Sequence, residues 1–264
     1  MPARPKRSEP GKPATVSRGA SRPAPRKGSP SAPAGGATPA GPAVRETPAA
    51  RKRRAARIVA ELQELYPDAT CALVHRNAFE LLVATILSAQ STDVTVNRIT
   101  PVLFERYPDP QALAEAPAAE VEKIIYPTGF FRQKTRSIIG AARAIVEEFG
   151  GRVPGTVAEL TRLPGVARKT ANVVVGTWFG RNEGVIVDTH VGRLARRLAL
   201  SPASRNDKDA LRIEQDLMEI LPQEKWTFTA HALVWHGRKV CSARKPDCQH
   251  CRLQKLCPAA FTFD

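Results

Sequence analysis

Apolar residues recur at helical spacing along most of this chain of 264 residues. The run from Phe79 to Leu87 follows the i, i+3, i+4, i+7, i+8 pattern of a helix with one well-buried face. Alternation of the strand type is almost absent, and the β-like run Val185-Ile186-Val187 is too short to build a sheet. The sequence therefore predicts an all-α fold. Further stripes predict helices near residues 51–66, 93–107, 121–125, 138–149, 157–160, 168–175, 191–200, 207–221 and 227–235.

The first 49 residues break from this pattern. They hold eleven of the 23 prolines and are otherwise rich in Ala, Gly, Ser and Arg. Such a segment has too little apolar surface to offset the entropy of ordering, so we expect residues 1–49 to form a disordered tail. Residues 1–57 contribute a net charge of +12 to the +15 of the whole chain. A basic arm of this kind suits a polyanion, and a solubilising tail with no specific partner is the alternative interpretation.

No run of eighteen apolar residues is present, and the N-terminus has no apolar stretch of the signal-peptide type. We therefore expect a cytoplasmic protein with no membrane span and no secretion signal.

One segment combines a tight turn, a helix start and a lysine. The segment is L-P-G-V-A-R-K-T, residues 163–170. Pro164 and Gly165 favour a turn, and Lys169 falls in the first turn of the apolar helix that follows. Free backbone N–H groups at a helix start attract anions, phosphate above all. The helix dipole disfavours a cationic lysine there, and a neutral lysine is a nucleophile that forms Schiff bases.

Asp188 follows nineteen residues after Lys169 and directly precedes another predicted helix. It is a candidate charged partner, and the two residues beside a phosphate-binding turn suggest chemistry on a nucleic-acid sugar. The alternative is a turn that only holds DNA, with Lys169 as a surface charge and Asp188 as a helix cap.

Four of the five cysteines lie near the C-terminus, at the spacing C-x6-C-x2-C-x5-C: Cys241, Cys248, Cys251 and Cys257. Zinc and a [4Fe–4S] cluster both accept four thiolates. Structural zinc usually uses two C-x2-C knuckles, and only one is present here, so the spacing favours iron–sulfur. His250, inside the knuckle, is an alternative ligand.

The loop between the first two of these cysteines is basic, because it contains Arg244 and Lys245. Metal ligation at both ends would make it rigid and well placed to hold backbone phosphates. An ordinary solvated loop is the alternative.

Five motifs occur in a fixed order: L-S-A-Q-S-T-D (87–93), L-P-G-V-A-R-K-T-A-N-V-V (163–174), V-D-T-H-V (187–191), H-G-R (236–238) and the cysteine spacing (241–257). On these motifs the chain resembles the endonuclease III family, which consists of bifunctional DNA glycosylase/AP lyases of the helix–hairpin–helix superfamily with a [4Fe–4S] cluster. The resemblance covers about residues 52–258 and excludes the tail.

The resemblance implies base excision repair. The enzyme would remove oxidised pyrimidines from duplex DNA and cleave the strand 3′ to the abasic site by β-elimination, through a lysine Schiff base. Its partner would be double-stranded DNA with a damaged base or abasic site, and it would act as a monomer at the bacterial nucleoid.

The resemblance also implies two helical lobes with an active-site cleft between them. Residues 77–185 would form a six-helix barrel that contains the hairpin at 161–174. Residues 50–76 and 186–264 would form a second lobe that carries the iron–sulfur cluster.

Residue roles follow from the same resemblance. Lys169 and Asp188 match the catalytic pair. Gln90 matches the residue that fills the space left by the extruded nucleotide, and Phe130 falls where the family places a wedge, often leucine, in the opposite strand. Ala167 stands where the hairpin often has a second glycine, so its Cβ narrows the approach of a phosphate slightly. The residues expected to contact DNA are Gln90, Phe130, Gly165, Ala167, Arg168, Thr170, Arg244 and Lys245.

Two other functions remain as alternatives. One is a monofunctional glycosylase that removes adenine from mismatches, a branch that lacks a lysine at this turn. The other is a DNA-binding module without enzymatic activity, which would carry a four-cysteine zinc site and need no lysine–aspartate pair.

Overall fold

The computed structural model describes residues 46–262, and no strand is present in that range. The all-α prediction is therefore confirmed. The predicted tail lies outside the described residues except for its last four positions, 46–49. The α-helices of the described residues are α1 (Pro48–Leu65), α2 (Ala78–Leu87), α3 (Asp93–Arg106), α4 (Pro110–Ala114), α5 (Ala118–Ile125), α6 (Phe131–Phe149), α7 (Val157–Leu160), α8 (Arg168–Thr177), α9 (Thr189–Arg197), α10 (Ala210–Ile220) and α11 (Trp226–Lys239). The short 3₁₀ helices are η1 (Tyr126–Thr128), η2 (Gln223–Lys225) and η3 (Gln254–Leu256).

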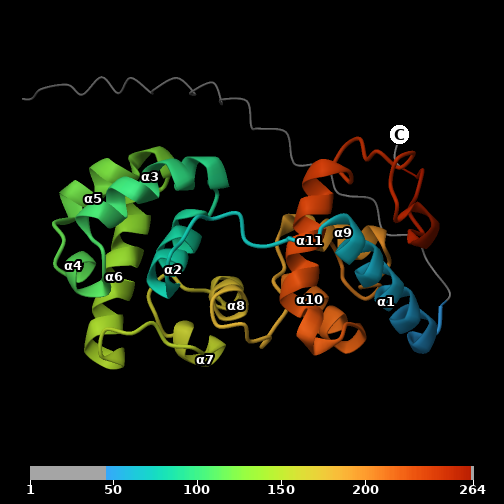
Figure 1. The fold of residues 1–264 in the computed structure, drawn as a ribbon, viewed down its shortest axis with the longest axis horizontal. Coiled ribbons are helices and arrows are strands. Elements are labelled where there is room, and N and C mark those ends of the chain that lie inside the picture. Colours follow the sequence, from blue (N-terminus) through green and yellow to red (C-terminus); the bar gives the residue numbers. More distant parts are fainter. Residues whose placement is uncertain (1–45, 263–264) are drawn as a thin grey trace, which may run out of the picture. The chain divides into compact units, whose positions relative to one another are not determined.

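Helices α2 to α8 pack mainly on one another (Figure 1). α4 and α5 lie against α6, α7 lies against α8, and α2 contacts α3, α6 and α8. Every residue of α2 from Phe79 to Leu87 is buried, although the apolar stripe predicted only one buried face. α2 is therefore the central helix of this group.

A second group consists of α1, α9, α10, α11 and η3 (Figure 1). α9 lies against α10 and α11, and α1 lies against α10, α11 and η3. α8 belongs to the first group but also contacts α11. Lys169, at the start of α8, lines a pocket together with residues of α11, so it lies close to both groups.

The first helix begins inside the predicted tail. Thr47 is the N-cap of α1, and its hydroxyl accepts a hydrogen bond from Ala50 N at 3.2 Å. Pro48 follows at the first helical position, where its missing N–H is not needed. These local signals start the helix three residues before Arg51.

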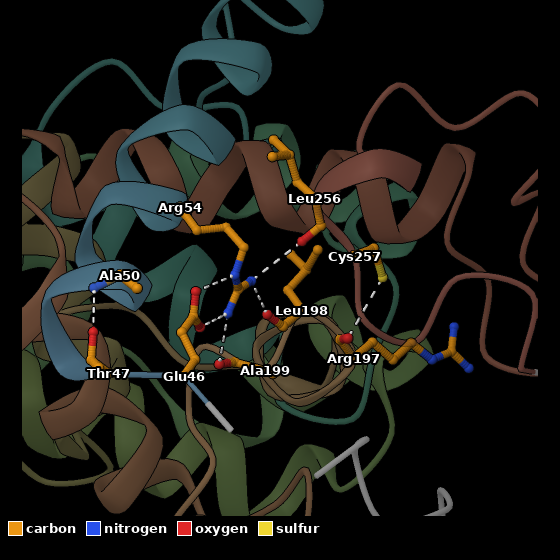
Figure 2. A network of polar contacts seen from close by, with 9 residues as sticks. All are labelled: Glu46, Thr47, Ala50, Arg54, Arg197, Leu198, Ala199, Leu256 and Cys257. Carbon is orange, nitrogen blue, oxygen red and sulfur yellow. Dashed lines mark hydrogen bonds and ion pairs between the residues drawn. The ribbon is translucent and has the colours of Figure 1, made fainter. Parts of the chain in front are cut away.

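Arg54 of α1 ties this helix to two distant segments (Figure 2). Its guanidinium donates to Leu198 O at 2.5 Å, just beyond α9, and to Leu256 O at 3.3 Å in η3. The same group pairs with Glu46 at 2.7 Å. Glu46 therefore belongs to the helical fold, because it holds Arg54 against these carbonyl groups.

The helices of the described residues include none that is both long enough and apolar enough to cross a membrane.

Candidate active site and cysteine cavity

Lys169 and Asp188 line the same pocket. The other walls come from segments far apart in sequence: the loop 70–73, the end of α2, the first residue of α3, and α11. The two residues predicted as a pair are therefore brought together by the packing of α8, α9 and α11.

The predicted hairpin is present as α7, a turn and α8. Gly165 in this turn has φ +77°, and a Cβ there would lie 2.5 Å from Ser137 Cβ of α6. Glycine is thus required both by the backbone conformation and by the close approach of α6. The turn is closed by Val166 N, which donates to Leu163 O at 3.1 Å.

α8 begins at Arg168, after the N-cap residue Ala167, whose side chain makes no capping hydrogen bond. The first N–H groups of any helix have no acceptor inside the helix, so those of Arg168, Lys169 and Thr170 are available to a ligand. The first turn of α8 therefore combines three N–H donors with the positive end of a helix dipole.

Lys169 is exposed and lines the pocket from the second position of α8. In the part of the chain that the structure describes, its Nζ has neither a hydrogen-bond partner nor a salt bridge. In particular, it forms no ion pair with Asp188. An amine in a pocket with no protein partner is free to meet a ligand.

Asp188 is the N-cap of α9. Its Oδ1 accepts hydrogen bonds from His190 N and Val191 N, both at 2.8 Å. These bonds hold the carboxylate in place and do not involve Oδ2. Asp188 is thus a helix cap and a pocket residue at once, so the two interpretations of its sequence position are compatible.

Three further pocket residues were not predicted as site residues. Arg238 of α11 pairs with Asp93, the first residue of α3, at 2.7 Å. His231, also of α11, is buried, and burial lowers its pKa to about 4, so it is neutral at neutral pH. Cys71 lies in the same pocket. Arg238 belongs to the H-G-R motif (236–238), but no local pattern placed it, His231 or Cys71 at this pocket, because only tertiary packing brings their segments together.

A buried carboxylate outside this pocket, that of Glu214, holds the first turns of α8. Glu214 of α10 accepts from Arg168 Nε at 2.8 Å and from Asn172 Nδ2 at 2.9 Å. These partners flank Lys169 in sequence, so Glu214 fixes the first turn of α8. Arg168 therefore contributes to the position of α8, and its Nε is already engaged.

The four clustered cysteines line one cavity, between the ends of α9 and α11 and the C-terminal loop. Within residues 46–262, no group of three or more His, Cys, Asp or Glu side chains converges closely enough to hold a single metal ion. His250 is not part of the lining, and its Nδ1 interacts with Asp247 at 2.9 Å.

Polar side chains around this cavity engage its sulfur atoms. Arg197 donates to Cys241 Sγ at 3.2 Å, and Cys257 Sγ lies 3.5 Å from Arg197 O (Figure 2). His236 Nε2 lies 3.4 Å from Cys251 Sγ, while its Nδ1 lies 3.0 Å from the Tyr66 hydroxyl. Of these contacts, the one from Arg197 is a donation to sulfur, and hydrogen bonds of this kind are common around cysteine-ligated metal groups.

Comparison with known proteins decides the family. Residues 83–223 match the family model described as HhH-GPD superfamily base excision DNA repair protein. The chain belongs to this superfamily. The predicted class is thereby confirmed: it is a base-excision DNA glycosylase, and its macromolecular partner is DNA.

Relatives within the HhH-GPD superfamily match over most of their length. Endonuclease III of Synechocystis sp. is 54% identical over 79% of this chain and 93% of its own. Endonuclease III of Bacillus subtilis is 43% identical over 75% of this chain and 88% of its own. A solved structure described as a trapped endonuclease III–DNA covalent intermediate is 42% identical, has a TM-score of 0.74, and is matched over 80% of this chain and 97% of its own.

Two residues that were expected to enter DNA lie at exposed loops of this HhH-GPD protein. Gln90 follows α2 and is exposed, and Phe130 precedes α6 with 67% of its surface exposed. Both have positive φ, +54° and +48°, although neither is glycine. Phe130 is thus no core aromatic, in contrast to Phe131, which is half-buried and contacts Tyr126.

Arg244 and Lys245 are both exposed on the loop between the first two cysteines. Arg197 braces this loop from inside, with donations to Ser242 O and Ala243 O at 2.7 Å each. The basic loop is therefore held by Arg197, and its two charges face solvent.

Proposed function

We propose that this protein is a bifunctional DNA glycosylase/AP lyase in which Lys169 is the nucleophile and Asp188 assists it. One pocket carries the proposal, because it contains both Lys169 and Asp188. Lys169 lies in the first turn of α8, the second helix of the hairpin, and its amine has no partner among the described residues. The carboxylate of Asp188 is held in place because it caps α9. The similarity to a covalent endonuclease III–DNA intermediate supports the same conclusion.

The reaction starts when the damaged nucleotide leaves the duplex, because Lys169 cannot reach a stacked sugar. Neutral Lys169 attacks C1′ of the deoxyribose, the glycosidic bond breaks, and the base leaves with a proton. The sugar ring then opens at the C1′–O4′ bond to give a Schiff base. Asp188 accepts the proton from the amine and stabilises positive charge that develops on the sugar.

Strand cleavage follows from the same intermediate. Loss of a proton from C2′ moves electrons into a C2′–C3′ double bond and expels the 3′-phosphate. Hydrolysis of the imine releases the unsaturated aldehyde and regenerates the amine of Lys169. The strand is thereby cut 3′ to the lesion.

DNA binding is assigned to three surfaces. The backbone N–H groups of Gly165 and Ala167, with Arg168 and Thr170, would hold phosphates at the hairpin. Gln90 would fill the space of the extruded nucleotide, and Phe130 would enter the opposite strand. Phosphates further along the duplex would be held by Arg244 and Lys245.

We propose that Cys241, Cys248, Cys251 and Cys257 hold a [4Fe–4S] cluster, since all four thiols surround one cavity. Such a cluster would cross-link the C-terminal loop to the end of α11, because Cys241 lies two residues after Lys239 and the other three cysteines lie in the loop. In this way it would support the basic loop that carries Arg244 and Lys245.

The remaining assignments are proposals of the same kind. Residues 77–185 would form the barrel lobe, and residues 50–76 with 186–264 the second lobe, with the DNA in the cleft between them. The substrate would be duplex DNA with an oxidised pyrimidine or an abasic site. The enzyme would act as a monomer in the bacterial cytoplasm, at the nucleoid.

Borohydride reduction tests the nucleophile. The parent protein should form a covalent adduct with abasic-site DNA, because reduction converts the Schiff base to a stable amine. Lys169→Gln should lose the adduct and still bind DNA, while Lys123→Gln, at an exposed lysine of α5, should trap like the parent. If Lys169→Gln traps as well as the parent, Lys169 is not the nucleophile.

A further inference from the structure

Lys134 is a buried lysine that the proposed chemistry does not use. It lies in the first turn of α6, and the residue is only 5% exposed. Burial lowers the pKa of its ammonium group. A cation removed from water is unfavourable unless its hydrogen bonds are made, and methionine would fill the same space without that cost. The presence of a lysine at this buried position is therefore explained by the hydrogen bonds of its nitrogen.

The nitrogen binds the backbones of two loops. Nζ donates to Leu87 O at 2.8 Å and to Thr128 O at 2.7 Å. Leu87 is the last residue of α2, three positions before Gln90. Thr128 ends η1, two positions before Phe130. One ammonium group thus joins the chain segments that lead to both residues proposed to enter the DNA.

Lys134 also holds the second loop through its main chain. Its backbone N donates to Phe130 O at 3.0 Å. Phe130 is therefore held on both sides, by the ammonium group at Thr128 and by the amide group at its own carbonyl.

Both loops have backbone conformations that need such support. Gln90 and Phe130 are two of the four non-glycine residues with positive φ in the described part of the chain. A left-handed conformation is strained for a residue with a Cβ, and it persists only where the surroundings impose it. Both side chains are exposed, so the support must come from the backbone contacts beneath them.

We propose that Lys134 is a positioning residue that sets the separation of Gln90 and Phe130 before DNA binds. The inference rests on the proposed function and adds a residue that touches neither the DNA nor the reacting atoms. Because the same ammonium group binds both backbones, the two loops keep one relative position. Groups held in their bound geometry lose less entropy on binding, so the preset spacing favours an extruded nucleotide.

The test compares binding of two duplexes, one undamaged and one with a tetrahydrofuran abasic analogue opposite 2-aminopurine. Lys134→Met should bind the tetrahydrofuran duplex about tenfold more weakly than the parent, because two charge-assisted hydrogen bonds are lost. Affinity for undamaged DNA should stay unchanged, and the rise in 2-aminopurine fluorescence, which reports unstacking, should be smaller. Lys134→Gln keeps one donor nitrogen, without the charge. Its affinity for the tetrahydrofuran duplex should therefore lie between those of the parent and of Lys134→Met.

Arg143→Met is the matched control. Arg143 also lies on α6 and donates from Nε to a carbonyl oxygen, that of Ala114, at 3.0 Å, but neither loop is involved. This variant should bind both duplexes like the parent. An equal loss of affinity for the tetrahydrofuran duplex in Lys134→Met and Arg143→Met would mean that these hydrogen bonds of α6 serve only folding. That result would overturn the proposal.

A double-mutant cycle separates positioning from a general structural effect. In a Gln90→Ala/Phe130→Ala background, Lys134→Met should weaken binding less than twofold, since the side chains that it positions are gone. A tenfold loss that persists in this background would overturn the proposal. Failure of the proposed function would look different: the parent protein itself would form no borohydride adduct.

Discussion

At the scale of single residues, one carboxylate performs two tasks at the candidate site. Asp188 caps α9 through Oδ1 and also lines the pocket of Lys169. Stability and chemistry depend on different properties of this side chain, because the cap needs an acceptor oxygen and the proposed reaction needs a negative charge. Substitutions can therefore separate them.

Asp188→Asn should retain the cap, since asparagine is as good an N-cap as aspartate. It should lower the single-turnover rate of base release by about 10²–10⁴-fold, the usual contribution of a general base. Asp188→Ala should show the same fall in the rate of base release and should also lose about 1 kcal/mol of folding stability, because alanine does not cap α9. Thermal unfolding and base-release assays on both variants measure the two effects, and a fully active Asp188→Asn would exclude the proposed role.

His231 gives a prediction for pH. Its pKa falls from 6.5 to about 4 on folding because of burial, so the unfolded chain binds more protons between these values. Its contribution to stability is complete above pH 6.5 and is lost as the pH falls towards 4, in total about 3 kcal/mol. His231→Gln should flatten the dependence of the unfolding free energy on pH between 6.5 and 4, measured by urea titration. An unchanged slope would show that other groups cause the acid sensitivity.

At the scale of elements, the hairpin depends on the contact between its turn and α6. Gly165 and Gly151 have nearly the same φ, +77° and +76°. A Cβ at Gly165 would lie 2.5 Å from Ser137, whereas nothing lies within 4 Å of a Cβ at Gly151. The pair therefore distinguishes backbone strain from steric overlap.

Gly151→Ala should cost about 1 kcal/mol of stability, the strain of a left-handed alanine. Gly165→Ala should cost about 1–3 kcal/mol more, because α6 must move away from the turn. The same variant should bind abasic-site DNA more weakly, and Gly151→Ala should not. Equal unfolding free energies for the two variants would show that the turn tolerates the added carbon.

The elements also show what a single sequence can and cannot predict. The helix α2 and the turn at Gly165 were predicted, because apolar periodicity and turn-forming residues are local properties of a sequence. α4 was missed, because a five-residue helix with Asp109 as its cap shows no period. α11 runs to Lys239, four residues beyond its predicted end, because polar residues continue the helix after the apolar stripe.

The site was predictable only in part for the same reason. Lys169 and Asp188 each follow a local signal, and the structure places both in one pocket. His231 joins them through tertiary packing, which a local pattern does not encode, and the H-G-R motif that contains Arg238 did not place that residue at the pocket. The same holds for Lys134, which lies before the helix predicted at 138–149, so neither its place in α6 nor its burial and its two carbonyl partners were predicted.

At the scale of the whole molecule, the net positive charge is concentrated in the N-terminal part of the sequence. Residues 1–45 hold nine Lys or Arg and one Glu. Each basic residue that neutralises a phosphate releases a counterion, which makes binding depend on salt.

Removal of residues 1–45 should weaken DNA binding at low salt and reduce the slope of log Kd against log salt concentration. The rate of strand cleavage at saturating enzyme should change little, since the pocket is intact. Removal of residues 1–49 is the informative comparison, because it also deletes Glu46 and the Thr47 cap and should lower the melting temperature. An identical salt slope with and without residues 1–45 would show that the segment does not bind DNA.

The contacts of Arg54 set an order of events during synthesis. Its carbonyl partners lie 144 and 202 residues further along the chain. The ribosome must therefore synthesise the chain through Leu256 before α1 can reach all of these partners, whereas most contacts of α2 to α8 form within one continuous stretch. α1 is thus among the last of the described helices to dock, and until then its apolar side lacks the partners that bury it in the folded protein.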